Sequence, residues 1–224
     1  MTGIHSMSLV LPGWQIALME VGLFGLISYL VRDNVQNLHA MHPLMYYWYC
    51  FTTLTGFWEC VYISDYKTIA QYAGTLVETG RSVWTMKFPI YYVCPVLFSK
   101  IFYAEYGAHA DREYMSTRKY DYLSRLVESS HMLFCAIFTF SALLGYTLGL
   151  EKACIIGAMG ISAQFMNSLL YMGYYFMECA DSNCPNFNSP SFPLGKWMYK
   201  RLFMWINIFW LVFPIMISYI ILVN

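Results

Sequence analysis

The chain has 224 residues, of which 58% are hydrophobic, 19% aromatic and only 12% charged, a composition too apolar for an ordinary soluble domain. Its 13 basic and 13 acidic side chains give a formal net charge of zero, so no overall field draws it to nucleic acid. Composition therefore predicts an all-α, polytopic membrane protein with a single domain over residues 1–224 and no nucleic-acid partner.

Five segments are long and apolar enough to cross a bilayer as helices, which takes about 20 mostly apolar residues. In chain order they cover residues 13–31, 44–64, 123–148, 153–177 and 202–223. The sequence thus predicts a five-helix membrane bundle whose termini face opposite sides.

A further apolar stretch, residues 88–103, is shorter and contains Pro89 and Pro95. Because proline removes a backbone N–H donor and bends a helix, we expect a kinked, interfacial or half-buried segment here. The stretch overlaps an insertion between the second and third spans, residues 68–99, whose aromatic and proline content suits packing against lipid or another protein.

Basic residues are distributed unevenly between the two sides of the predicted bundle. One side receives only Arg32 and Lys152. The other side receives the remaining 11, namely Lys67, Arg81, Lys87, Lys100, Arg112, Arg118, Lys119, Arg125, Lys196, Lys200 and Arg201. By the positive-inside rule the N-terminus then faces the cytosol or, in a mitochondrion, the matrix.

Polar side chains inside the spans point to function, because a charge at mid-bilayer costs at least ~2.5–3.5 kcal/mol and usually faces a cavity or a partner. Most of them repeat at intervals of three or four residues, so they share one face of their helix. They are Glu128 and His131 in the third span, Gln164, Asn167 and Tyr171 in the fourth, Asn207, Trp210 and Pro214 in the fifth, and Glu59 beside Trp58 in the second. If these faces converge, the bundle encloses a polar patch walled by aromatic rings.

Each pattern also has a structural interpretation. An ion pair with Arg125 near the membrane surface would account for Glu128, and amide side chains often join helices by hydrogen bonds worth about 0.6–2 kcal/mol. A glycine pair four residues apart, at 145 and 149, is typical of close helix packing. His39 and His42 have no third ligand nearby, so neither a metal nor another cofactor is expected.

Seven cysteines are present, and only Cys179 and Cys184 share a predicted loop. Their spacing permits a disulfide, whereas the charge distribution places this loop on the reducing side of the membrane. The two inferences conflict if the bridge exists.

Three segments resemble the EXPERA-domain family, which includes emopamil-binding protein (the sterol Δ8–Δ7 isomerase) and the sigma-2 receptor. They are INIFWLVFP at 206–214, EYGAHADREY at 105–114, and the pair LVESSH at 126–131 and AQFMNSLLYM at 163–172. The likeness covers most of the chain from about Gly56 onward and agrees with the five-span layout of the isomerase branch.

The resemblance implies an intramembrane proton transfer. In the isomerases an acid protonates a sterol ring double bond, a neighbouring group removes a proton from the adjacent carbon, and aromatic rings can stabilise the carbocation between these steps. Glu128, Asn207 and Trp210 match family positions on the third and fifth spans.

Other positions depart from the family pattern. Where the isomerases have His and, four residues later, Glu in the second span, this chain has Glu59 and Ile63. The Asp position of the fourth span is Asn167, and His131 falls where the family has Thr. Half of the expected proton-transfer apparatus is therefore missing from its usual place.

Two functions follow from these departures. Loss of the second-span pair favours a protein without isomerase activity, which binds a lipid or sterol or serves as an accessory subunit of a larger membrane complex. The alternative is an active Δ8–Δ7 isomerase in which Glu128 and His131 replace the lost pair. The expected ligand-binding residues are Glu59, Trp58, Gln164, Asn167, Tyr171, Asn207 and Trp210.

The expected location is an organelle membrane. Family members in the endoplasmic reticulum commonly end in a lysine-rich tail, whereas this sequence has no basic residue after Arg201. The endoplasmic reticulum and the mitochondrial inner membrane are the two candidate locations.

Overall fold

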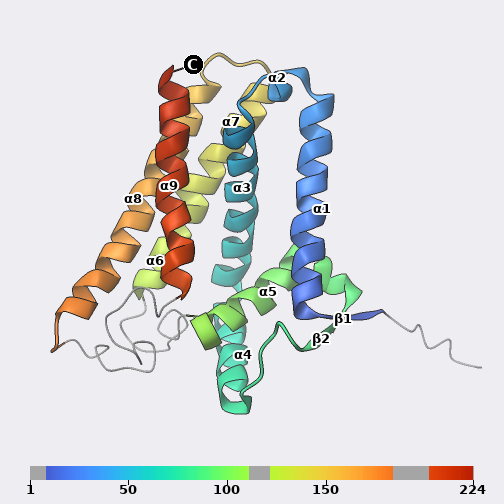
Figure 1. Cartoon of the computed structure of the whole chain (residues 1–224), viewed down its shortest axis with the longest axis vertical. Coiled ribbons are helices and arrows are strands. Elements are labelled where there is room, and N and C mark those ends of the chain that lie inside the picture. The colour runs from blue at the N-terminus through green and yellow to red at the C-terminus, as the bar shows by residue number, and fades with distance from the viewer. Residues whose placement is uncertain (1–8, 111–121, 184–201, 224) are drawn as a thin grey trace, which may run out of the picture.

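The structure, a computed structural model, describes residues 9–110, 122–183 and 202–223 (Figure 1). Its α-helices are α1 Gly13–Asn34, α2 Gln36–His39, α3 Pro43–Ser64, α4 Tyr66–Thr79, α5 Pro95–Glu105, α6 Tyr122–Ser130, α7 Ile137–Thr147, α8 Ala153–Ala180 and α9 Leu202–Val223. Shorter helical turns are η1 Ile90–Val93, η2 Tyr106–Ala110 and η3 His131–Ala136. Two short antiparallel strands, β1 Val10–Pro12 and β2 Lys87–Pro89, form a ribbon that composition did not predict.

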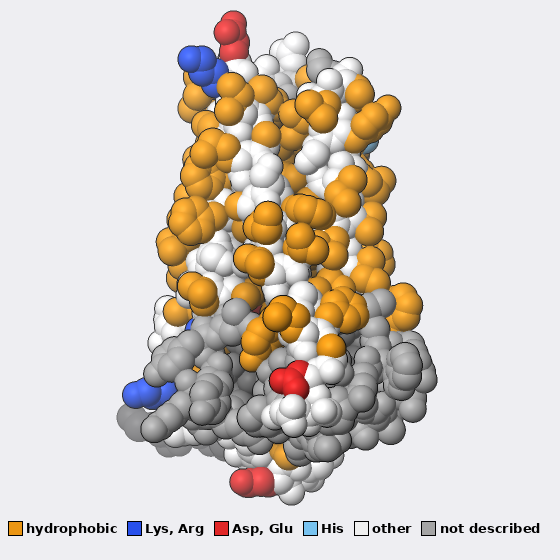
Figure 2. All heavy atoms as spheres, turned by 90° about the vertical axis from the view of Figure 1, so that its left-hand side faces the viewer, with side chains coloured by type: hydrophobic (Ala, Val, Ile, Leu, Met, Phe, Trp, Pro, Cys, Tyr) orange, Lys and Arg blue, Asp and Glu red, His pale blue; other side chains and the backbone are white. Residues whose placement is uncertain are grey.

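Four helical segments of the described chain are long and apolar enough to cross a membrane: Gly13–Asn34, Arg125–Thr147, Ala153–Met177 and Trp205–Val223. Their outward faces are apolar, and Figure 2 shows hydrophobic side chains over most of the height of one face, with charged groups towards its two ends. A surface of this kind is stable in lipid and not in water. The prediction of an integral membrane protein is therefore confirmed, with one span fewer than the sequence indicated.

The remaining long helix, α3, matches the predicted segment 44–64 but is too polar to count among the four spans. It has 22 residues, as α1 has, and stands between α1 and α9 in Figure 1. Twelve residues of α3 are buried, compared with four of α1. Because its neighbours surround it, α3 can carry inward polar groups that a lipid-facing helix could not.

The stretch 88–103 is not one kinked segment. Pro89 ends strand β2, and Pro95 begins α5 at its first turn, where a missing N–H donor has no cost. The 11 residues of α5 span only about 17 Å, too short to cross a bilayer core of about 30 Å. Figure 1 shows α5 lying across the lower end of the bundle.

Polar contacts fasten α5 to α3 and α4. The Ser99 hydroxyl donates to the carbonyl of Trp58 at 2.7 Å, and Lys100 Nζ lies 2.6 Å from Asp65 Oδ2. The hydrogen bond from Lys100 holds the pKa of Asp65 below its usual value. Both partners of this ion pair are partly exposed, so it orients the helices more than it stabilises them.

The distribution of basic residues agrees with the helix arrangement. Arg32 ends α1 and Lys152 precedes α8, both at the upper end in Figure 1. The other basic residues of the described segments lie on α4, α5 and α6 or between α4 and α5, at the lower end; they are Lys67, Arg81, Lys87, Lys100 and Arg125. α1 begins at this lower end and α9 finishes at the upper end.

The glycine pair at 145 and 149 marks the end of a helix as well as a packing contact. Gly149 has a φ of +69°, Leu150 N–H donates to the Gly145 carbonyl at 2.9 Å, and Gly149 N–H donates to the Tyr146 carbonyl at 3.0 Å. This is the Schellman arrangement that ends many helices. Gly145 also lies close to Ala153, the first residue of α8.

Gly56 allows the closest contact between α3 and the third span. A methyl group added at Gly56 would overlap the side chain of Ala136 in η3. Glu59 is less than one turn further along α3, so this contact sets how near Glu59 comes to the neighbouring helix.

We predict that Gly56→Leu lowers the free energy of unfolding by at least about 1–3 kcal/mol, because added atoms must separate two packed helices. The control is Gly22→Leu in α1, where nothing lies within 4 Å of an added methyl group. Thermal unfolding in mild detergent measures both variants. Equal melting temperatures for the two would contradict the proposed close contact.

Candidate functional site

The third span changes its helical pitch where its polar residues lie. Arg125–Thr147 is a continuous helix in which His131–Ala136 forms a wide π turn between α6 and α7. Such turns are rare and are frequently found at functional sites. This turn begins at His131, one turn after Glu128.

Asn167 of α8 holds the residues just before the π turn. Its Nδ2 donates to the Val127 carbonyl at 3.1 Å, and its Oδ1 accepts from the Ser130 hydroxyl at 2.7 Å. The hydroxyl of Ser130 also lies 2.9 Å from the Val127 carbonyl. Asn167 therefore joins two helices, as the structural interpretation of the amide side chains expected.

His131 connects the third span to α3 and α8. Its Nδ1 lies 2.6 Å from Oε1 and 2.7 Å from Oε2 of Glu59, and its Nε2 lies 3.0 Å from Nε2 of Gln164. His131, Glu59 and Gln164 are all buried. Since bilayer core and protein interior offer no water to these groups, each must find its partner within the bundle.

The partners of Gln164 determine which nitrogen of His131 carries the proton. Trp48 Nε1 can only donate, and it lies 2.7 Å from Gln164 Oε1, so the amide NH₂ faces the other way. That NH₂ donates to Thr52 Oγ1 at 3.1 Å and to His131 Nε2. With Nε2 accepting, the imidazole proton must be on Nδ1, where it is donated to Glu59.

A second carboxyl group completes the network. Glu59 and Glu128 are hydrogen-bonded to each other, and the Tyr103 hydroxyl donates to Glu128 Oε2 at 3.2 Å. Burial raises the pKa of Tyr103 well above its usual value, so this hydroxyl keeps its proton and acts as a donor. Two carboxylates cannot hydrogen-bond without a proton, and since Glu59 already accepts from His131, we assign that proton to Glu128.

We call Tyr103, Glu128, Glu59, His131 and Gln164 the carboxyl–imidazole network. It joins three long helices and α5 through one chain of hydrogen bonds. Glu128 is its least buried carboxyl group, because it is partly exposed whereas Glu59 is 5% exposed. Glu128 is therefore the member best placed to meet a ligand.

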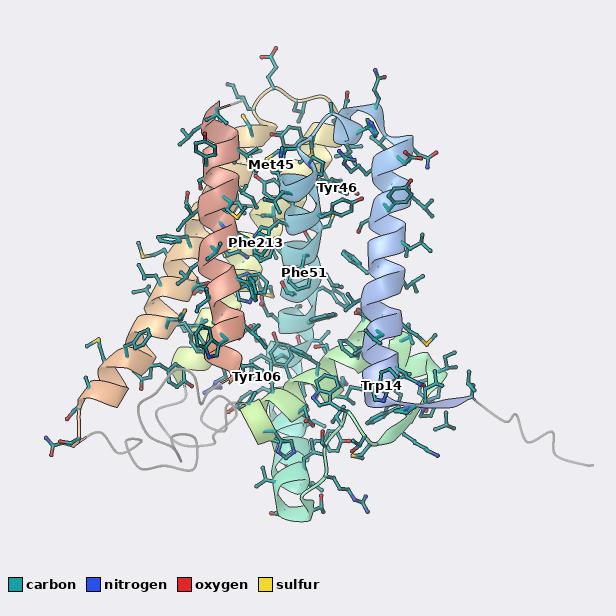
Figure 3. All side chains as sticks on the ribbon, viewed as in Figure 1. Trp14, Met45, Tyr46, Phe51, Tyr106 and Phe213 are labelled. Atoms are coloured by element: carbon teal, nitrogen blue, oxygen red, sulfur yellow. The ribbon has the colours of Figure 1, made fainter. Side chains whose placement is uncertain are left out.

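Aromatic side chains from α3 and α9 line one side of the network. The Trp210 ring meets the His131 ring edge-on with centroids 5.2 Å apart, and it stacks on Phe51 at 5.6 Å. Trp48 stacks on Phe213 at 4.4 Å, and Figure 3 shows Phe213 between α9 and α3. The convergence expected for Glu59, Gln164 and Trp210 is thus present in the structure.

Two predicted site residues, Trp58 and Tyr171, lie away from the network. Trp58 points to α1, where its Nε1 donates to Glu20 Oε1 at 3.2 Å. The Tyr171 hydroxyl lies 3.4 Å from that of Tyr106, at the lower end of the bundle. Asn207 is partly buried on α9, one turn before Trp210.

Sequence reasoning did not select Tyr103, Thr52, Trp48 or Glu20. Tyr103 belongs to α5 and ends the stretch 88–103, which the sequence predicted as a kinked, interfacial or half-buried segment. A tryptophan or threonine in a membrane helix is too common to single out. Glu20 was detectable, since it is the one acidic residue within the first predicted span.

Among the described residues, no group of three or more His, Cys, Asp or Glu side chains is spaced to hold a metal ion. His42 caps α3, because its Nδ1 accepts from the Leu44 N–H at 3.2 Å.

The guanidinium of Arg125 lies over the ring of Tyr66, 4.8 Å from the centroid. The possible disulfide falls outside the described side chains, which include neither Cys179 nor Cys184.

A cavity of about 610 Å³ opens at the opposite, upper end of the bundle. Its walls come from the start of α3, the turn between α7 and α8, and the last turn of α9. No member of the carboxyl–imidazole network lines it. This cavity and the network are therefore separate features.

Comparisons of the chain with models of protein families, with curated proteins and with solved structures find no match.

We predict that Gln164→Leu lowers the free energy of unfolding by about 1–3 kcal/mol, because Trp48, Thr52 and His131 each lose a buried partner. The control is Gln71→Leu on the exposed side of α4. Thermal unfolding in detergent compares the two variants. An unchanged melting temperature for Gln164→Leu would contradict the hydrogen-bond assignment.

Proposed function

We propose that this chain is an EXPERA-like protein of five membrane spans, with α3 as the central one, that binds a sterol-type lipid and shifts a ring double bond. The observation that carries this proposal is the hydrogen-bonded chain from Glu128 through Glu59 to His131. It combines a proton donor and a proton acceptor in an environment from which water is excluded.

The reaction requires only protons to move. Glu128 donates its proton to one carbon of the double bond, whose π electrons form the new C–H bond and leave a carbocation on the other carbon. Glu59 then accepts a proton from the next carbon, and the electrons of that C–H bond form the shifted double bond. The proton returns from Glu59 to Glu128 along their hydrogen bond, so no oxidant or reductant is needed.

Two further features support this chemistry. His131 donates its Nδ1 proton to Glu59 and so keeps the carboxylate in place while it exchanges protons. The Trp210 ring, edge-on to His131, offers the kind of π face that stabilises a nearby cation.

The geometry also weakens the main argument against activity. By resemblance, the second-span His and Glu of the isomerases are missing, which favoured a protein without activity. Here Glu59 of α3 pairs with His131 of the next long helix, so a carboxylate and an imidazole meet from two helices, whereas the isomerases carry both on the second span. This compensation is why we place the isomerase function first.

The second candidate is a non-catalytic subunit that binds lipid or supports a larger membrane complex. It is favoured by the hydrogen bonds of the network, since Glu59, His131 and Gln164 bond to side chains of the protein itself. A purely structural network would have the same property. For either function, the basic lower end is proposed to face the cytosol or the mitochondrial matrix.

We predict that the purified protein converts a Δ8-sterol to the Δ7 isomer, and that Glu128→Gln and Glu59→Gln each reduce kcat at least about 100-fold. The control is Glu78→Gln on the exposed side of α4. In D₂O the product gains deuterium at the protonated carbon to the extent that Glu128 exchanges its proton with solvent between turnovers, and mass spectrometry detects this. Absence of turnover in wild-type protein that co-purifies with a large assembly would favour the accessory-subunit function instead.

A further inference from the structure

The first span contains a buried carboxyl group that the carboxyl–imidazole network does not use. Glu20 is 3% exposed and lies seven residues after the start of α1, roughly 10 Å into the span. An acidic side chain at this depth is costly and is by default a candidate functional group.

Only one of its two oxygens has a partner. Trp58 Nε1 donates to Glu20 Oε1 at 3.2 Å, while Oε2 is buried and accepts no hydrogen bond. Trp58 itself is held firmly, because its ring packs against Phe98 and Phe102 with centroids 5.2 and 5.4 Å apart. The unpaired oxygen is therefore a fixed feature of the interface between α1 and α3.

Contacts between α1 and α3 are few along this interface. The inward side of α1 follows the spacing Ile16, Glu20, Phe24 and Ser28. Near its upper end the Tyr46 hydroxyl donates to the Ser28 carbonyl at 2.7 Å, and Figure 3 shows Tyr46 between the two helices. The Glu20–Trp58 and Tyr46–Ser28 bonds are two polar links between these helices, and on either side α1 faces outward with apolar side chains.

We propose that Glu20 is a second binding site of the bundle, which takes the hydrogen-bond-donating end of a membrane amphiphile at the boundary of α1 and α3. The chemistry follows from the orphan oxygen. A carboxylate oxygen only accepts hydrogen bonds, so the complementary group is an ammonium or a hydroxyl, and a carboxylate or phosphate end is repelled. The apolar body of the ligand lies along the exposed apolar side chains of α1.

Glu20→Gln tests this site with no change in side-chain size. Because Trp58 can only donate, the amide oxygen of the glutamine must face Trp58, and its NH₂ then replaces Oε2. This donor meets the ammonium, which can only donate, whereas a hydroxyl can turn its oxygen towards the NH₂ and accept from it. The variant keeps the contact between α1 and α3 but loses the acceptor.

The probes are octadecylamine, octadecanol and octadecanoic acid, each with a photoreactive diazirine near its polar end, added to the protein in lipid nanodiscs. We expect the amine or the alcohol to label peptides of α1 and α3 around Glu20 and Trp58, and the acid to give at most a tenth of that labelling. Glu20→Gln should reduce labelling by the amine at least tenfold. An amine preference would identify an ionic contact, and equal labelling by amine and alcohol would identify a neutral hydrogen bond.

The matched control is Glu59→Gln, which disrupts the carboxyl–imidazole network but leaves Glu20 and its labelling intact. The two proposals are thereby tested separately. Equal labelling by all three probes, or unchanged labelling by the amine in Glu20→Gln protein with a wild-type melting temperature, would overturn the Glu20 site.

Discussion

The hydrogen bond between His131 Nδ1 and Glu59 is the interaction on which the rest of the bundle depends. It places a carboxylate and an imidazole where neither lipid nor water can satisfy them, so every neighbouring polar group must be oriented to complete the network. Gln164 fixes the imidazole tautomer from one side, and Glu128 supplies a proton from the other. Removing any partner leaves a buried group unpaired, which costs more than the hydrogen bond itself contributes.

This constraint explains features of the helices that apolarity alone does not. α3 is the most enclosed of the long helices, and it carries polar and aromatic side chains because each has a neighbour to meet. Gly56 lets the third span approach α3 closely enough for Glu59 to reach His131. The π turn starts at His131, so the change of pitch lies where the helix must direct two polar side chains towards one partner.

Local sequence patterns predicted where the helices lie, whereas the contacts between helices could not be predicted from a single sequence. Runs of apolar residues located the spans to within a few residues, and three-and-four spacing placed Glu128 with His131 on one helix face. The spacing could not show that Glu59 and Trp58, adjacent in sequence, face different helices, because that depends on where α1 and the third span lie around α3. Nor could it distinguish one proline-kinked segment from a strand followed by a short helix, since Pro89 and Pro95 suit both.

Glu20, Glu59 and Glu128 differ in the property that separates structural from ligand-binding groups. Glu59 and Glu128 share their hydrogen bonds with each other and with side chains from other helices, so protons can move among them without the entry of water. Glu20 has one rigid donor and one unpaired oxygen at a thinly packed helix boundary. Burial of an unpaired carboxyl oxygen costs stability unless something completes it. Both oxygens of Glu59 have a hydrogen-bond partner, whereas one oxygen of Glu20 has none. We therefore propose that the missing partner of Glu20 comes from the membrane.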